Sequence, residues 1–148
     1  MKPSEIRTEL LDQHAQIRAN MLDARALAER SVKGEDVRDP LHHALVHLAS
    51  LLRAHNQREE ELMKDVFPTL DAWGPIRKEI MLEEHVEEHQ QVVDALMTAS
   101  SAPDAVEAAK KTIKLFDRLL GHMAREEKVF LSEDVLSDEG VPPDWFGG

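Results

Sequence analysis

The chain has 148 residues, a net charge of −11 and no cysteine. Its length fits one domain, and its acidic excess argues against nucleic acid as a partner, because non-specific binding needs clustered positive charge. The lack of cysteine excludes disulfides, iron–sulfur clusters and cysteine nucleophiles. No apolar run reaches the length of a signal peptide or a membrane span. We therefore expect a cytoplasmic protein with no membrane partner.

Helical periodicity predicts four helices, separated by breakers. Ser4 is the expected N-cap of the first helix, and Asp39 followed by Pro40 is expected to open the second. A segment that resembles a capping box, 101–104, precedes the fourth helix. The predicted helices extend over about 4–30, 40–65, 75–100 and 103–130.

No segment alternates between apolar and polar residues as a half-buried strand does. Long helices with short connections are typical of an antiparallel bundle. The prediction is therefore an all-α fold: one domain over residues 1–148, an up-down-up-down four-helix bundle with an irregular tail at 131–148.

An apolar seam runs along each predicted helix and turns polar where a histidine enters it. In the second helix, the leucines from Leu41 to Leu52 are followed by His55 and Glu59 at alternating spacings of four and three residues. Polar groups on a core stripe cost free energy unless something satisfies them. The same feature in four helices indicates one shared buried partner. The polar seam residues are His14, His55, Glu59, His85, His89, His122 and Glu126.

The histidines are expected to meet at one depth of the bundle. His14 and His55 lie equally far from the first predicted turn, and His55 and His85 lie equally far from the second. His122 is offset from this level by roughly one helical turn or less. Residues four apart share a helix face, which applies to three pairs: His55/Glu59, His85/His89 and His122/Glu126.

Five imidazoles and two carboxylates without sulfur suit Fe, Zn, Mn, Cu or Ni. Seven donors are too many for one ion, so two bridged ions fit better. If each ion takes about six ligands, these side chains and one solvent-derived bridge leave one position open. An open position on a redox-active pair in an apolar pocket suits a small ligand such as O₂.

This ligand order resembles the hemerythrins, including the hemerythrin-like (HHE cation-binding) domains of bacteria, over residues from about 5 to 131. The resemblance implies a four-helix bundle with two non-haem iron ions joined by an oxo or hydroxo bridge. It implies that one iron binds His85, His89 and His122, that the other binds His14 and His55, and that Glu59 and Glu126 bridge them. The implied activities are reversible O₂ carriage, O₂ or redox sensing, iron handling, and responses to nitric oxide or peroxide.

The last bridging carboxylate departs from the oxygen-carrying hemerythrins, which place an Asp five residues after its histidine. Here Glu127 holds that position, whereas Glu126 lies four residues after His122. The HHE form uses the shorter spacing, and Glu126 lies on the seam, so Glu126 is the predicted ligand and Glu127 the alternative. This departure argues against reversible O₂ carriage more than it argues against iron binding.

The leading prediction is a di-iron protein that binds O₂ or a related small ligand for storage, carriage or sensing, and is not primarily an enzyme. One alternative is an enzyme on the same metal pair, or an iron-handling protein, that responds to peroxide or nitric oxide. Others are a bis-histidine haem bundle and a zinc-loaded or metal-free module that acts through a protein partner, which the sequence does not identify. The three remaining histidines, expected on the surface, are His42, His43 and His47.

Overall fold

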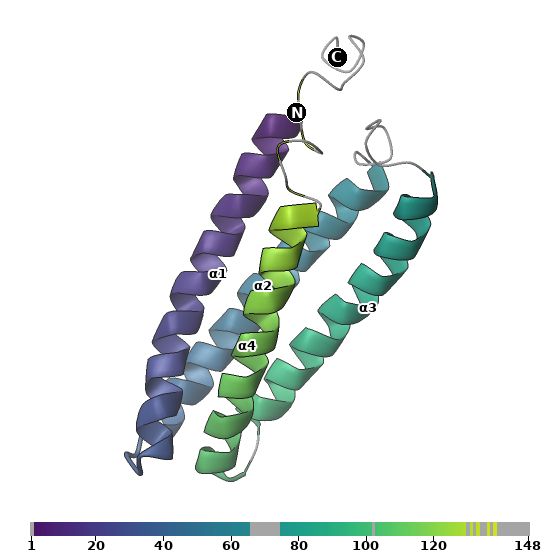
Figure 1. The fold of residues 1–148 in the computed structure, drawn as a ribbon. Coiled ribbons are helices and arrows are strands. Elements are labelled where there is room, and N and C mark those ends of the chain that lie inside the picture. The colour runs from purple at the N-terminus through teal and green to yellow at the C-terminus, as the bar shows by residue number, and fades with distance from the viewer. Residues whose placement is uncertain are drawn as a thin grey trace.

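Four helices pack side by side in the computed structural model of this chain. The structure describes residues 2–65, 75–101, 103–129, 131, 133, 136 and 138. The side chains of 63, 65 and 75–85 are not described. The helices are α1 (Pro3–Val32), α2 (Arg38–Asp65), α3 (Pro75–Ser100) and α4 (Ala105–Val129). Successive helices run in opposite directions, and each contacts its two neighbours around the ring (Figure 1). No strand occurs among the described residues. The predicted all-α four-helix bundle is thereby confirmed. Most of the predicted tail, 131–148, lies outside the described residues.

The start of α1 differs from the prediction. Lys2, not Ser4, is the N-cap, and its backbone N–H donates to the Glu5 carboxylate at 2.7 Å. Ser4 instead donates its backbone N–H and its hydroxyl to the Asp138 carboxylate, at 2.9 and 2.8 Å. Asp138 follows α4 in the chain, so a contact between distant segments overrides the local capping preference of serine.

Two other predicted helix starts also shift. α2 begins at Arg38, so Asp39 lies in its first turn and is not the N-cap. Before α4, the Asp104 carboxylate accepts a hydrogen bond from the Val106 backbone N–H at 2.9 Å. Asp104 therefore caps this helix directly. In the predicted capping box, Ser101 was the N-cap and Asp104 was the third residue of the helix.

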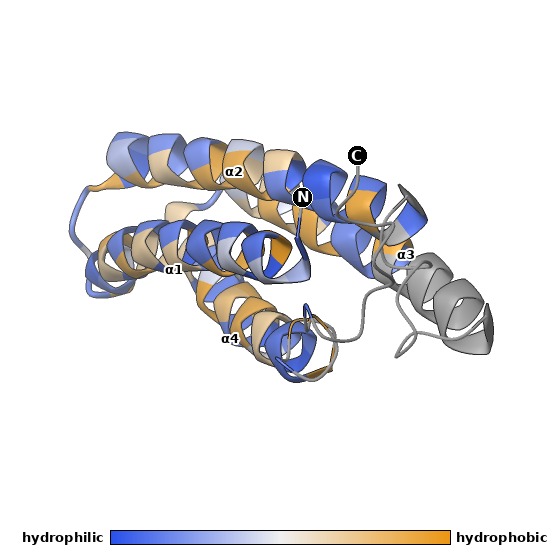
Figure 2. Cartoon of the chain, turned by 90° about the horizontal axis from the view of Figure 1, so that it is seen from above, coloured by the Kyte–Doolittle hydropathy of each residue, from blue (hydrophilic) through white to orange (hydrophobic). Residues whose placement is uncertain are grey.

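The apolar seams meet in a continuous core along the bundle axis. Apolar and polar residues share each coloured helix (Figure 2), and most of the buried residues are apolar. Leu45, Leu48 and Leu52 of α2 pack in one cluster with Ile17 of α1 and Leu119 of α4. Burial of this apolar surface is the main stabilising term. Among the described helices, none is both long and apolar enough to cross a bilayer.

Candidate metal centre

The apolar core gives way to a buried polar cluster at the level where the histidines enter the seams. All four helices contribute to it, and none of its members is more than 5% exposed. Six of the seven predicted residues come together there: His14, His55, Glu59, His89, His122 and Glu126. The seventh, His85, lies outside the residues whose side chains are described.

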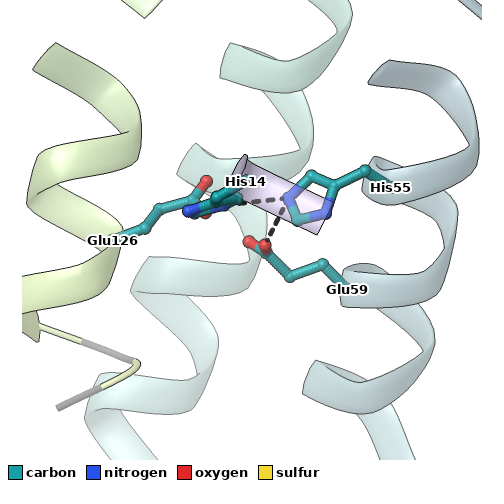
Figure 3. Close-up of side chains that lie close together, drawn as sticks. All are labelled: His14, His55, Glu59 and Glu126. Atoms are coloured by element: carbon teal, nitrogen blue, oxygen red, sulfur yellow. Dashed lines mark hydrogen bonds and ion pairs between the residues drawn. The ribbon is translucent and has the colours of Figure 1, made fainter. Parts of the chain in front are cut away.

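One group of donor atoms comes from side chains of α1, α2 and α4, which Figure 3 draws close together. Nε2 of His14 lies 3.2 Å from Nε2 of His55 and 3.1 Å from Oε2 of Glu126. Nε2 of His55 also lies 2.9 Å from Oε2 of Glu59. The four ligand atoms fall within 4.8 Å of one another, so all four side chains point toward one small volume.

A second group of donor atoms involves α3 and α4 and shares Glu126 with the first. Nε2 of His89 lies 3.4 Å from Oε1 of Glu126, and Nε2 of His122 contacts the same oxygen. Oε1 of Glu59 faces His89 at 3.8 Å, whereas its Oε2 faces His55. Each of the two carboxylates therefore turns one oxygen toward each group, as a bridge between two ions requires.

The spacing of these atoms fits metal coordination. Imidazole and carboxylate ligands lie about 2.1 Å from a metal ion, so neighbouring ligands at right angles are separated by about 3 Å. The contacts that His14 makes with His55 and Glu126, 3.2 and 3.1 Å, match this separation. Glu59 and Glu126 are 3% and 2% exposed. Carboxylates buried this deeply are expected to be paired or to bind a cation.

A second ring of side chains surrounds the cluster. Each of the four histidines described in the cluster turns Nε2 inward and Nδ1 toward an oxygen on a neighbouring helix. The Nδ1–oxygen pairs are His55–Gln13 at 2.6 Å, His89–Glu60 at 3.2 Å, His122–Glu88 at 2.8 Å and His14–Glu127 at 3.1 Å. An Nδ1–H that donates to these oxygens leaves the Nε2 lone pair free, so the hydrogen bonds of His14, His55 and His89 hold these imidazoles in the form that binds metal. His122 pairs with Glu88 at ion-pair distance, without the geometry of a hydrogen bond.

The outer ring closes around the bundle in one direction. Each helix supplies the oxygen for a histidine of the next helix: α1 to α2, α2 to α3, α3 to α4, and α4 back to α1. Every member is also adjacent in sequence to a cluster residue of its own helix, as Glu127 is to Glu126. Neighbouring helical residues point about 100° apart, so when one faces the axis the next faces an adjoining helix. None of these four residues was predicted as a partner of a histidine, and Glu127 was expected only as the alternative bridging carboxylate.

Arginines fix two of the outer carboxylates. Arg18 donates to both oxygens of Glu127, at 2.7 and 2.8 Å, and this lowers the pKa of the Glu127 carboxyl. Burial works to lower the pKa of His14, but hydrogen bonds to Glu126 and Glu127 and the charges of Glu126 and Glu59 outweigh it and raise that pKa. Arg125 donates to both oxygens of Glu88, at 2.8 and 3.1 Å.

The geometry separates the two candidate carboxylates on α4. Glu126 is 2% exposed and faces three histidines, whereas Glu127 is partly exposed and faces Arg18 and the outer side of His14. Glu127 thus lies in the outer ring. The histidines expected on the surface are exposed, as predicted: His42, His43 and His47.

Comparison with known families gives a match that covers most of the chain. The model of the hemerythrin HHE cation-binding domain matches residues 5–133. No curated protein and no solved structure matches the chain significantly. The matched residues contain the whole buried cluster and its outer ring. The chain therefore belongs to the hemerythrin HHE cation-binding domain family.

Proposed function

We propose that this cation-binding domain holds two non-haem iron ions, bridged by an oxo or hydroxo group, and binds O₂ or a related small ligand for storage, carriage or sensing. One observation carries the proposal: two groups of buried donor atoms share Glu126, whose two oxygens face different groups. A single ion uses one such group, whereas a shared carboxylate between two groups suits a pair of ions.

The residues of the cluster divide between the two ions. His14 and His55 would hold one ion, and His89 and His122, with His85 from the sequence prediction, would hold the other. Glu59 and Glu126 would bridge them. Imidazole nitrogens and carboxylate oxygens bind several metals, and iron is one of them. The family assignment favours iron. Iron in such a site supplies a reversible change of oxidation state and a coordination position for a small ligand.

The chain's own residues keep the site ready for this ligand. The outer oxygens orient the imidazoles, and Arg18 and Arg125 in turn hold Glu127 and Glu88 in place. The apolar core beside the cluster excludes bulk water. A set dominated by histidine favours ligand binding over harsh oxidation, so a carrier or sensor is proposed before an enzyme. The cytoplasmic location and the lack of a nucleic-acid partner stay predictions.

The proposal is tested by absorption spectra of the iron-loaded protein in air, after deoxygenation and after O₂ is restored. We expect a band that disappears without O₂ and returns with it. His55→Ala should abolish the band, whereas His47→Ala, an exposed histidine on the same helix, should leave it intact. Steady consumption of peroxide or nitric oxide would favour the enzyme instead. A protein that binds no iron would refute the proposal.

A further inference from the structure

A surface cavity of about 260 Å³ opens between α2 and α3, beside the metal centre. Its wall includes Gln57, Glu60 and Val86, together with Asn56 and His89. His89 belongs to the metal cluster, and Glu60 is its outer partner. The cavity therefore reaches from the surface to an imidazole of the cluster.

A second and much smaller void lies inside the bundle. It is bordered by the imidazoles of His55, His89 and His122 and by apolar side chains such as Leu52 and Leu119. Its volume, about 10 Å³, accommodates roughly one water-sized particle. Asn56 and His89 line both this void and the outer cavity, so these two side chains stand between them.

Asn56 is the unusual residue at this junction. It follows His55 in α2 and is 8% exposed, yet its amide makes no hydrogen bond to the part of the chain that the structure describes. An amide offers two N–H donors and a carbonyl acceptor. Neither polar atom of this amide is among the fully buried atoms that lack a partner, so the amide also meets the outer cavity. Because it makes no hydrogen bond to the described chain, the amide is available to a ligand that enters the void beside it.

We propose that a small ligand reaches the centre between α2 and α3, and that the Asn56 side-chain amide donates a hydrogen bond to it in the inner void. This inference rests on the proposed function, since it takes the cluster to hold metal. The size of the void limits the ligand to the smallest molecules, such as O₂ or nitric oxide, and azide serves as an anionic probe of the same position. A hydrogen bond from Asn56 favours a ligand that gains negative charge or already carries it.

Azide binding to the iron-loaded protein tests the assignment. Asn56→Leu has a similar size and removes the amide, so the dissociation constant for azide should rise about fivefold while the iron content stays unchanged. Gln57→Leu is the matched control, because Gln57 lines the outer cavity but not the inner void. It should bind azide as the wild type does.

Infrared spectra distinguish a hydrogen bond to the ligand from a purely structural role of Asn56. The stretching band of bound azide should shift when H₂O is exchanged for D₂O in the wild type, and this shift should be lost in Asn56→Leu. If that variant loses helicity, Asn56→Ala repeats both measurements without adding volume.

The outcomes separate this inference from the proposed function. Iron-loaded wild type that binds azide no more tightly than Asn56→Leu, with the same isotope response, would overturn the role of Asn56 and leave the metal site standing. Iron-loaded wild type that binds no azide would likewise overturn the role of Asn56 and leave the metal site standing. A wild type that holds no iron would overturn the proposed function and, with it, this inference.

Discussion

Glu127 shows how a residue outside the cluster acts on a residue inside it. Its carboxylate accepts two hydrogen bonds from Arg18 and faces Nδ1 of His14 at 3.1 Å. The negative charge favours an Nδ1–H on His14 and raises the electron density at Nε2, the atom that faces Glu126 and His55. Glu127 therefore acts as a positioning residue for His14.

Replacement of Glu127 by glutamine tests this role. The amide keeps an oxygen near His14 but lacks the charge, and it loses the ion pair with Arg18. The variant should still take up the same number of iron ions, with an affinity about tenfold to a hundredfold lower for the weaker site. Anaerobic Fe(II) titration measures both quantities. Glu107→Gln, an exposed carboxylate on the same helix, is the control, and equal affinities in both variants would contradict the role.

At the scale of single residues, the sequence predicted the inner cluster but not the outer ring. Seam periodicity alone marks His55 and Glu59 as facing the axis, and the structure buries both. The partner of His55 is Gln13, on another helix. Such a pairing depends on which helices are neighbours and in which direction the ring turns. Neither is encoded in the spacing of residues along one helix.

Gly121 in α4 has no packing role in the structure. Among the residues that the structure describes, no atom outside the local helix backbone lies within 4 Å of a Cβ placed at this position. Its backbone is helical. The position therefore tolerates a side chain without a clash.

Gly121→Ala should consequently raise the free energy of unfolding by about 1 kcal/mol, because alanine loses less backbone entropy in a helix. Urea unfolding of the metal-free protein measures the change. Gly34→Ala is the opposing control: its Cβ also has open space, but its φ of 94° is unfavourable for alanine. That variant should be less stable than the wild type. A loss of stability in Gly121→Ala would show that the position carries an unrecognised contact.

The N-terminus of α1 is held by Asp138, a residue that no local pattern connects to it. The Ser4 backbone N–H and then its hydroxyl stabilise the charged carboxylate and lower the pKa of Asp138. A carboxylate is also favoured there by the positive end of the helix dipole. The prediction of Ser4 as N-cap was wrong for this reason, since only the folded chain brings Asp138 to α1.

The lowered pKa of Asp138 gives stability a pH dependence with a definite sign. Its stabilising contribution is present above the ordinary carboxyl pKa of about 4 and is lost as the pH falls through the lower folded value. Asp138→Asn should therefore be less stable than the wild type at pH 7, and the difference should vanish in strong acid. Urea unfolding at several pH values measures it. A difference that stays constant down to pH 2 would rule out this carboxylate as its source. Asp36→Asn, in the loop after α1, is the control.

For the molecule as a whole, the bundle and the cluster depend on each other. Four seams turn polar at one depth, so the antiparallel packing that buries the leucines also brings the histidines together. Helix periodicity and turn positions were enough to predict this arrangement. The void beside Asn56 was not predictable, because it depends on how side chains from several helices fill the space between them.

A bound metal pair should in turn hold the helices to one another. Ions that bind the folded state and not the unfolded chain stabilise it by mass action. Because two donor groups share Glu126, we expect the metal-free protein to bind two ions. Anaerobic titration with Fe(II), followed to saturation, measures this stoichiometry. The expected result is two iron ions per chain. Saturation at one ion, or no uptake by a protein whose helices remain folded, would contradict it.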